Sequence, residues 1–201
     1  MWGGDHRGIY TVKSSYKSLM GTINGSEVVN GVDFWLGVWN LGIRPSVKNF
    51  LWRAALDILL TTCNLNKRRV PISLTCSVCG GFKEDVHHVL LSCSTTAACW
   101  AEARVEALSG DQGSFVDWLG GLFKQSTKNK MEVVAMIAWN IWNNRNSIVW
   151  KNQAKFPYQV VNYAKSHLQA WKQARNRRLS IPNGAVSTDM NQWSRLEIGY
   201  V

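Results

Sequence analysis

The chain has 201 residues, of which 46% are hydrophobic and 11 are tryptophan, so it is large and apolar enough to bury a core. This composition excludes a wholly disordered or low-complexity protein. Lys and Arg outnumber Asp and Glu by 23 to 13, which gives a formal net charge of +10. Such a balance favours a polyanionic partner, nucleic acid before any other.

The sequence also restricts the expected compartment. No stretch reaches the ~18 apolar residues that span a bilayer, and residues 1–7 lack the apolar segment of a secretory signal. We therefore expect a protein that is not secreted and has no membrane partner, and reduced cysteines would suit a nuclear or cytoplasmic site. The odd number of cysteines, 5, argues against a disulfide framework and leaves reduced thiols that are either buried or bound to metal.

The first half of the chain favours short helices over strands. A β-prone run and a short helix are expected within residues 8–20, and residues 21–33 are rich in Gly, Asn and Ser and suit a loop. Apolar residues recur at helical spacing after a proline and predict an amphipathic helix over 46–60. Two more helices are expected, one from Thr61 or Thr62 through residue 69, and one over 94–110.

The second half predicts three longer helices, at about 114–124, 128–151 and 157–178. A Gly-rich loop at 110–114 is the best internal boundary. The expected fold class is therefore mainly α, with a small helical domain at 1–108, a helical connecting region at 109–179 and a tail at 180–201. Seven tryptophans are predicted to pack in the core because their spacing matches buried helix faces: Trp35, Trp39, Trp52, Trp100, Trp139, Trp142 and Trp150.

A cluster of metal-ligand residues carries the clearest chemistry. Cys76 and Cys79 are three apart, a pair of adjacent histidines follows, and Cys93 comes next, so one reading is C-x2-C-x8-H-x4-C. Three thiolates and one imidazole make a closed tetrahedral shell that suits structural Zn²⁺. The spacing alone leaves His87 and His88 both open as the imidazole ligand. Cys63 and Cys99 are predicted to be buried thiols instead of ligands.

Several motifs in a fixed order resemble a known family. They run from Gly8-Ile9-Tyr10-Thr11-Val12-Lys13-Ser14, through Trp35 and Trp39, Val47–Arg53 and Lys67-Arg68-Arg69, to Cys76-x2-Cys79, Glu84-x3-His88-x4-Cys93 and Trp100. This order strongly resembles the zinc-binding domain that follows the reverse transcriptase in plant LINE-type (non-LTR) retroelements, over about residues 2–103. The resemblance implies the zinc ligands Cys76, Cys79, His88 and Cys93, and favours His88 over His87. One departure is Leu60, where the family usually has proline.

The second half resembles the same relatives. Residues 138–146 are similar to a Trp/Arg-Asn helix between the zinc region and a ribonuclease H-like domain, and residues 193–201 look like the entry to that nuclease. The resemblance implies that the parent polyprotein's reverse transcriptase and ribonuclease H-like domains are partners. We expect the chain to be a truncated slice of such a polyprotein, ending before the nuclease's catalytic aspartate.

No catalytic constellation is evident in the sequence. Polymerase and ribonuclease H chemistry both need clustered carboxylates that hold metal ions, and the acidic residues here are scattered. We therefore predict no enzymatic activity, and a zinc-binding accessory module that assists RNA or DNA binding. The alternative is a truncated or domesticated remnant that serves a structural or protein-interaction role.

Two basic segments are candidates for nucleic-acid contact. Residues 67–69 are consecutive cations, and residues 151–178 contain seven Lys or Arg and no acidic residue, a pattern that attracts phosphates without reading sequence. Tyr163 and Trp171 are candidates for stacking on exposed bases. The alternative for both segments is a solvated helix face. The candidate contact residues are Lys67, Arg68, Arg69, Lys172, Arg175, Arg177 and Arg178.

Overall fold

The structure is a computed structural model that describes residues 32–81, 83–105 and 113–179. In this part of the chain it contains seven α-helices, one π-helix and a single isolated β-bridge between Thr75 and Lys83. The mainly α prediction is confirmed. The elements expected within 8–20, most of the 21–33 loop and the 180–201 tail lie outside the described residues.

In chain order the helices are α3 (Val32–Asn40), α4 (Pro45–Ala55), α5 (Thr62–Lys67), η1 (His88–Ser92), α6 (Ser94–Glu102), α7 (Phe115–Gln125), α8 (Lys128–Lys151) and α9 (Pro157–Leu179). The longest connection between the described helices, residues 68–87, joins α5 to η1, and most of the others are only a few residues long. The three helices predicted in the second half are confirmed to within about one residue at their ends. Side-chain caps explain two of these starts, because Ser114 and Thr127 accept hydrogen bonds from the third residue of α7 and α8.

Two predicted helices are shorter in the structure than expected. The helix predicted over 46–60 ends at Ala55, because Asp57 takes a left-handed backbone conformation with φ 53°. The helix predicted to reach residue 110 ends at Glu102, and Arg104 likewise has φ 53°. Helix α3 was not predicted, since its aromatic-rich sequence shows no clean period.

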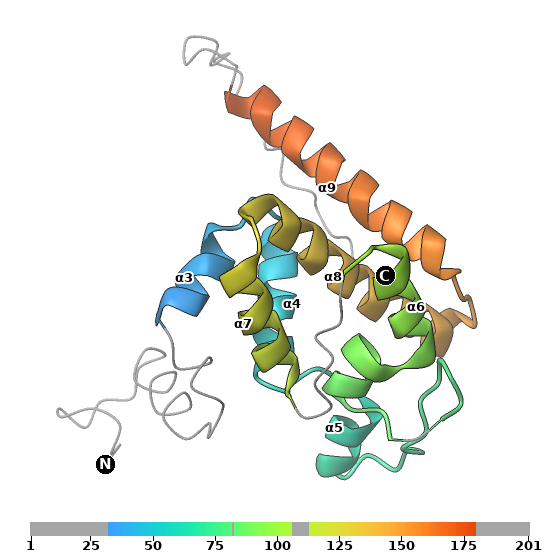
Figure 1. Cartoon of the computed structure of the whole chain (residues 1–201). Coiled ribbons are helices and arrows are strands. Elements are labelled where there is room, and N and C mark those ends of the chain that lie inside the picture. The colour runs from blue at the N-terminus through green and yellow to red at the C-terminus, as the bar shows by residue number, and fades with distance from the viewer. Residues whose placement is uncertain (1–31, 82, 106–112, 180–201) are drawn as a thin grey trace, which may run out of the picture.

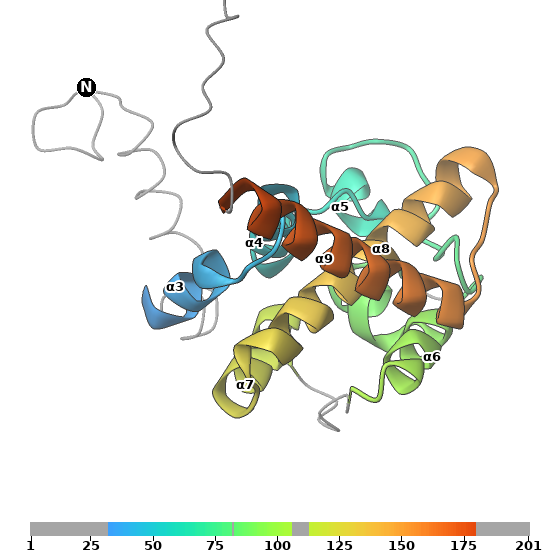
Figure 2. The ribbon, with the colours of Figure 1, turned by 90° about the horizontal axis from the view of Figure 1, so that it is seen from above.

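Helix α8 is the centre of the packing. It contacts α4, α6, η1 and α9, and Figure 1 shows α9 as the long outer helix that lies across it. In Figure 2, α3 and α7 lie together at one end of the molecule. The middle of the buried face of α8 is apolar, and the residues from Val134 to Ala138 are at most 1% exposed.

One hydrophobic core spans the boundary expected between residues 108 and 109. Trp100 from the first half packs against Trp118 from the second, with ring centroids 5.1 Å apart. Val47 and Leu51 of α4 belong to the same cluster as Ile137 of α8. The division at that boundary stays a prediction, and the described residues on its two sides are packed as one body.

The prediction for the tryptophans is only partly right. Trp100 is buried, and Trp35, Trp52, Trp139 and Trp142 are half-buried. Trp39 and Trp150 are 47% and 80% exposed, so the prediction that they lie in the core is wrong. Both lie in the last turn of a helix, where the chain has passed the end of its packed face. Among the described residues, no helix is long and apolar enough to cross a membrane.

Candidate metal centre

Four side chains from two segments converge on one point. The sulfurs of Cys76, Cys79 and Cys93 and a ring nitrogen of His88 all lie within 4.8 Å of one another. The Sγ of Cys79 is 3.4 Å from Nε2 of His88. With zinc–sulfur bonds of about 2.3 Å, two tetrahedral sulfur ligands would be about 3.8 Å apart. The cluster is therefore able to hold one metal ion with only small shifts.

The first pair of thiols is presented by a tight turn. The Gly80 N–H donates to the Cys76 carbonyl at 2.9 Å, and the Cys76 N–H donates to the Gly81 carbonyl at 3.3 Å. Gly80 has φ 67°, a left-handed conformation in which glycine pays no steric cost. The Thr75–Lys83 bridge closes the turn behind it. This geometry explains why a glycine follows the C-x2-C pair.

The second pair comes from a π-helical turn. The Cys93 N–H donates to the His88 carbonyl at 2.8 Å, which is the i to i+5 bond of a π-helix. That bond brings two residues five apart to the same side of the chain. Asp85 fixes the start of the turn, since its carboxylate accepts from the His88 N–H at 2.7 Å. His88 and Cys93 therefore lie at the two ends of a helical turn with π instead of α geometry.

The electrostatics of the thiols explain why they need a cation. Burial raises the pKa of Cys76 to about 12 and also raises the pKa of Cys93. Burial alone would raise the pKa of Cys79 too, but the Gly81 N–H and the neighbouring thiols outweigh it and lower that pKa. Three thiols this close cannot all ionise without a positive charge between them, and a divalent ion supplies it.

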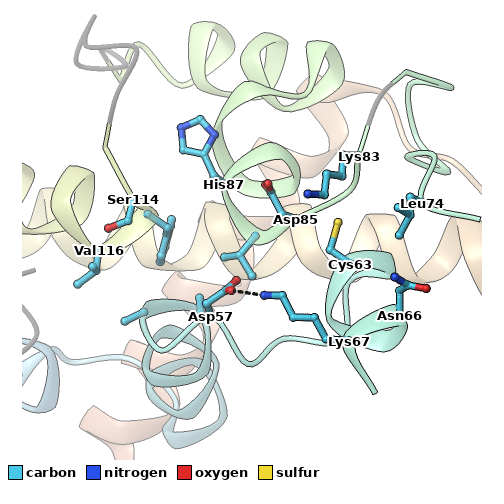
Figure 3. Close-up of a pocket in the computed structure, with 14 residues that line it drawn as sticks. Asp57, Cys63, Asn66, Lys67, Leu74, Lys83, Asp85, His87, Ser114 and Val116 are labelled. Atoms are coloured by element: carbon cyan, nitrogen blue, oxygen red, sulfur yellow. Dashed lines mark hydrogen bonds and ion pairs between the residues drawn. The ribbon is translucent and has the colours of Figure 1, made fainter. Parts of the chain in front are cut away.

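The other candidate ligands point elsewhere. His87 lines an open pocket of about 520 Å³ together with Cys63, Lys67 and Asp85, and Figure 3 shows its ring beside that pocket. Cys63 and Cys99 are 5% and 1% exposed and lie outside the four-residue cluster, as predicted for buried thiols. The structure therefore brings His88, and not His87, to the cysteines.

Comparison with known proteins agrees with this geometry. A family model described as zinc-binding in reverse transcriptase matches residues 10–100. The match covers 91 of the chain's 201 residues, and over them the chain resembles this zinc-binding family. The reverse-transcriptase zinc-binding domain is a non-catalytic module with zinc as its cofactor, and the Cys76, Cys79, His88 and Cys93 cluster is the part of it that is able to hold the ion.

A curated relative extends the match beyond this domain. The "Putative ribonuclease H protein" of Arabidopsis thaliana is 29% identical to this chain over 122 residues, which is 59% of the chain. The match covers 19% of that relative, so the chain spans only a small part of the protein it resembles. No solved structure matches the chain. Together the comparisons identify a retroelement-related zinc-binding module.

A buried ion pair ties the zinc-binding domain to α8. Glu84 is 0% exposed and receives two hydrogen bonds from the Arg145 guanidinium, one of them 3.2 Å from Nε to Oε2. Glu84 also accepts from the Thr62 N–H at 3.0 Å, at the start of α5. The sequence motifs contained both residues, but nothing in one sequence indicated that they pair. Their pairing gives Glu84 a positioning role next to the ligand-bearing segment.

The predicted nucleic-acid residues occupy two separate places. Lys67, Arg68 and Arg69 are exposed at the end of α5, and Lys67 pairs with Asp57 at 3.2 Å. Arg175 and Arg177 are exposed on α9, and the side chain of Arg178 lies outside the described residues. Lys172 forms an ion pair with buried Glu132 at 2.5 Å, so the Glu132 carboxylate partly neutralises the charge of Lys172. The candidates therefore do not form one continuous basic patch.

Proposed function

We propose that this chain is a zinc-stabilised, non-catalytic accessory module of a retroelement polyprotein. In this proposal Cys76, Cys79, His88 and Cys93 are the four ligands of one structural zinc ion. The observation that carries it is the closed set of four protein ligand atoms within 4.8 Å, which leaves no position for a reactive water. Zinc would then add folding energy to a segment that has little core of its own.

We further propose that the module helps a reverse transcriptase hold RNA or DNA. The exposed cations at 67–69 and on α9 support this, because such charges bind phosphates without reading sequence. The name of the Arabidopsis relative supports a polyprotein setting in which a ribonuclease H-like domain is a partner. The polymerase and nuclease chemistry would lie in those partner domains, and this chain would contribute binding.

The zinc proposal is tested by metal analysis of the purified chain. We expect one zinc per chain, lost in Cys76→Ser and Cys93→Ser. The adjacent histidines give a matched pair, because His88→Ala should lose zinc while His87→Ala should keep it. Cys63→Ala, a buried thiol outside the cluster, is the control for general damage to the core. Full zinc in His88→Ala would contradict the ligand assignment.

The nucleic-acid proposal is tested by titrating single-stranded RNA and DNA at several salt concentrations. Binding should weaken steeply with salt, and Arg68→Gln/Arg69→Gln should reduce both the affinity and the salt slope. Lys124→Gln, an exposed cation at the end of α7, is the control. An absence of binding at low salt would favour the alternative, a structural or protein-interaction remnant with no nucleic-acid role.

A further inference from the structure

Three large aromatic side chains are exposed to solvent at the turn between α8 and α9. Trp150 is 80% exposed, Phe156 is 67% exposed and Tyr158 is 52% exposed. Lys151 and Lys155 are exposed between them. We call Trp150, Lys151, Lys155, Phe156 and Tyr158 the aromatic turn. Exposed aromatic surface is unfavourable in water. Several large exposed rings at one turn therefore indicate a surface that binds a partner.

The backbone of the aromatic turn is held firmly from beneath. Asn144, which is 5% exposed, accepts from the Lys155 N–H at 2.9 Å. Asn152 ends α8 in a left-handed conformation with φ 52°, and its N–H bonds back to the helix. The Phe156 N–H donates to Gln159 at 2.9 Å at the start of α9. A partner would therefore meet rings whose backbone is already ordered, which reduces the entropy cost of binding.

Two pairs of side chains at the start of α9 lie close together. The rings of Phe156 and Tyr158 are nearly parallel, with an interplanar angle of 10° and centroids 6.0 Å apart. The Lys155 ammonium lies 5.8 Å from the ring centroid of Tyr163, one of the stacking candidates, which is itself 48% exposed. A ring face suits a nucleobase, and an ammonium beside it suits the phosphate that follows the base.

The sequence on both sides of the aromatic turn is basic, which favours an anionic partner. No Asp or Glu occurs between Glu132 and Asp189, so the last five turns of α8, the connection and all of α9 carry no acidic residue. A purely apolar protein partner would make no use of the two lysines. An acidic peptide would make no use of the three exposed aromatic rings. Unpaired bases on a phosphate backbone use both features.

We infer that the aromatic turn is a stacking site for the unpaired bases of single-stranded nucleic acid, with Lys151 and Lys155 on the adjoining phosphates. This inference rests on the proposed nucleic-acid function. It places the base contacts on residues outside the 10–100 match and away from the cations at 67–69. The site would prefer single strands, because the bases of a duplex are already stacked on one another.

The test measures the affinity of the zinc-loaded full chain for a labelled single-stranded RNA 20-mer across a range of salt concentrations. Trp150→Ala/Phe156→Ala should weaken binding about tenfold or more, with the salt slope unchanged, because stacking releases no counterions. Lys151→Gln/Lys155→Gln should instead reduce the slope by about 0.7 for each lost phosphate contact. Trp150→Tyr/Phe156→Tyr should restore the affinity, since it keeps two ring faces. Trp39→Ala removes an exposed tryptophan on α3 and is the matched control.

The outcomes separate this site from the broader proposal. If the aromatic variant binds like the wild type while Arg68→Gln/Arg69→Gln binds weakly, the stacking site is wrong and the nucleic-acid function stands. If the wild-type chain binds no RNA even at low salt, both are wrong. Equal losses on single-stranded and duplex RNA would overturn the stacking site. So would an aromatic variant that only abolishes self-association, because the turn would then be a contact between copies of the chain.

Discussion

Two neighbouring regions of this molecule are held together in different ways. At the start of the zinc knuckle, residues 73–93, and just before it, Val70, Ile72 and Leu74 are 36–40% exposed. In the α8–α9 pair, by contrast, Met131, Ile137 and Val161 are at most 1% exposed. The knuckle contains the four ligand residues, and it joins the apolar core only from Val86 onward. Metal coordination is therefore available where the first part of the knuckle buries little apolar surface.

The two regions also meet through different contacts. The apolar Val89 and Leu90 of η1 join the common core, while Glu84 and Arg145 form the buried ion pair beside them. Damage to the zinc site should therefore loosen the knuckle and leave α8 and α9 packed. Damage to the core of α8 should unfold both.

Removal of zinc should have the largest effect, and a local one. Structural zinc contributes on the order of 10 kcal/mol in small zinc-binding peptides, so its loss should unfold the knuckle. Hydrogen exchange after treatment with a chelator should show amides near Cys76 and Cys93 losing protection. Amides of α8 near Ile137 should stay protected, because their core contains no metal ligand. Uniform loss of protection would show that the two regions do not fold separately.

Breaking the buried ion pair should come next. Arg145→Met leaves the Glu84 carboxylate buried without its cation, and such a change typically costs about 3–5 kcal/mol. Urea unfolding of the zinc-loaded chain measures the loss. The double variant Glu84→Gln/Arg145→Met should recover part of it, because the unpaired charge is gone. Arg68→Met, at an exposed position, is the matched control and should change stability by less than about 0.5 kcal/mol.

The sequence predicted the helical region better than the connections. Helices α7, α8 and α9 were found because long apolar periods and cap residues such as Ser114 and Thr127 are local signals. The end of α4 was missed because the apolar period continues past it, and neither the left-handed Asp57 nor the hydrogen bond from the Asn64 side chain to its carbonyl shows in that period. Helix α3 was missed because its burial comes from packing against α7.

Most of the side chains that converge in the candidate metal centre could be singled out from the sequence, for a similar reason. The ligand types and their spacing are local, so Cys76, Cys79 and Cys93 could be singled out from the sequence. The choice of His88 needed the family resemblance, since spacing does not tell two adjacent histidines apart. The Glu84–Arg145 pair spans 61 residues and was beyond reach of any local pattern. Trp150 was misassigned because helical spacing does not show where a neighbouring helix stops.

A core substitution in α8 tests whether the zinc knuckle and the α8–α9 pair share one core. Ile137 is 0% exposed, and Ile137→Ala should cost about 2–5 kcal/mol through lost burial and the cavity left behind. Both regions should lose stability together in thermal unfolding, because η1 packs on the same core. Val149→Ala, near the exposed end of the same helix, is the control and should have little effect. A loss confined to α9 would contradict a shared core.

The smallest expected effect comes from Glu132, which ties α8 to two other elements. Its carboxylate accepts from the Gly42 N–H at 2.6 Å and pairs with Lys172 of α9. An added Cβ at Gly42 would lie 2.8 Å from a Glu132 carboxylate oxygen, so the Glu132 side chain would have to shift. Burial alone would raise the pKa of Glu132, but the hydrogen bonds from Lys172 and Gly42 outweigh it and lower that pKa.

The sign of the pH effect follows from that lowered pKa. A carboxyl whose folded pKa lies below its unfolded value of about 4.3 adds stability above that pH, and the added stability is lost as the pH falls through the folded value. Glu132→Gln should therefore be less stable than the wild type at pH 7, by about 1–2 kcal/mol. The difference between the two should shrink below pH ~4. Glu102→Gln, at an exposed position on α6, is the control and should differ little in stability from the wild type. If the stability difference between Glu132→Gln and the wild type stayed constant with pH, the Glu132 charge would not stabilise the α8–α9 pair.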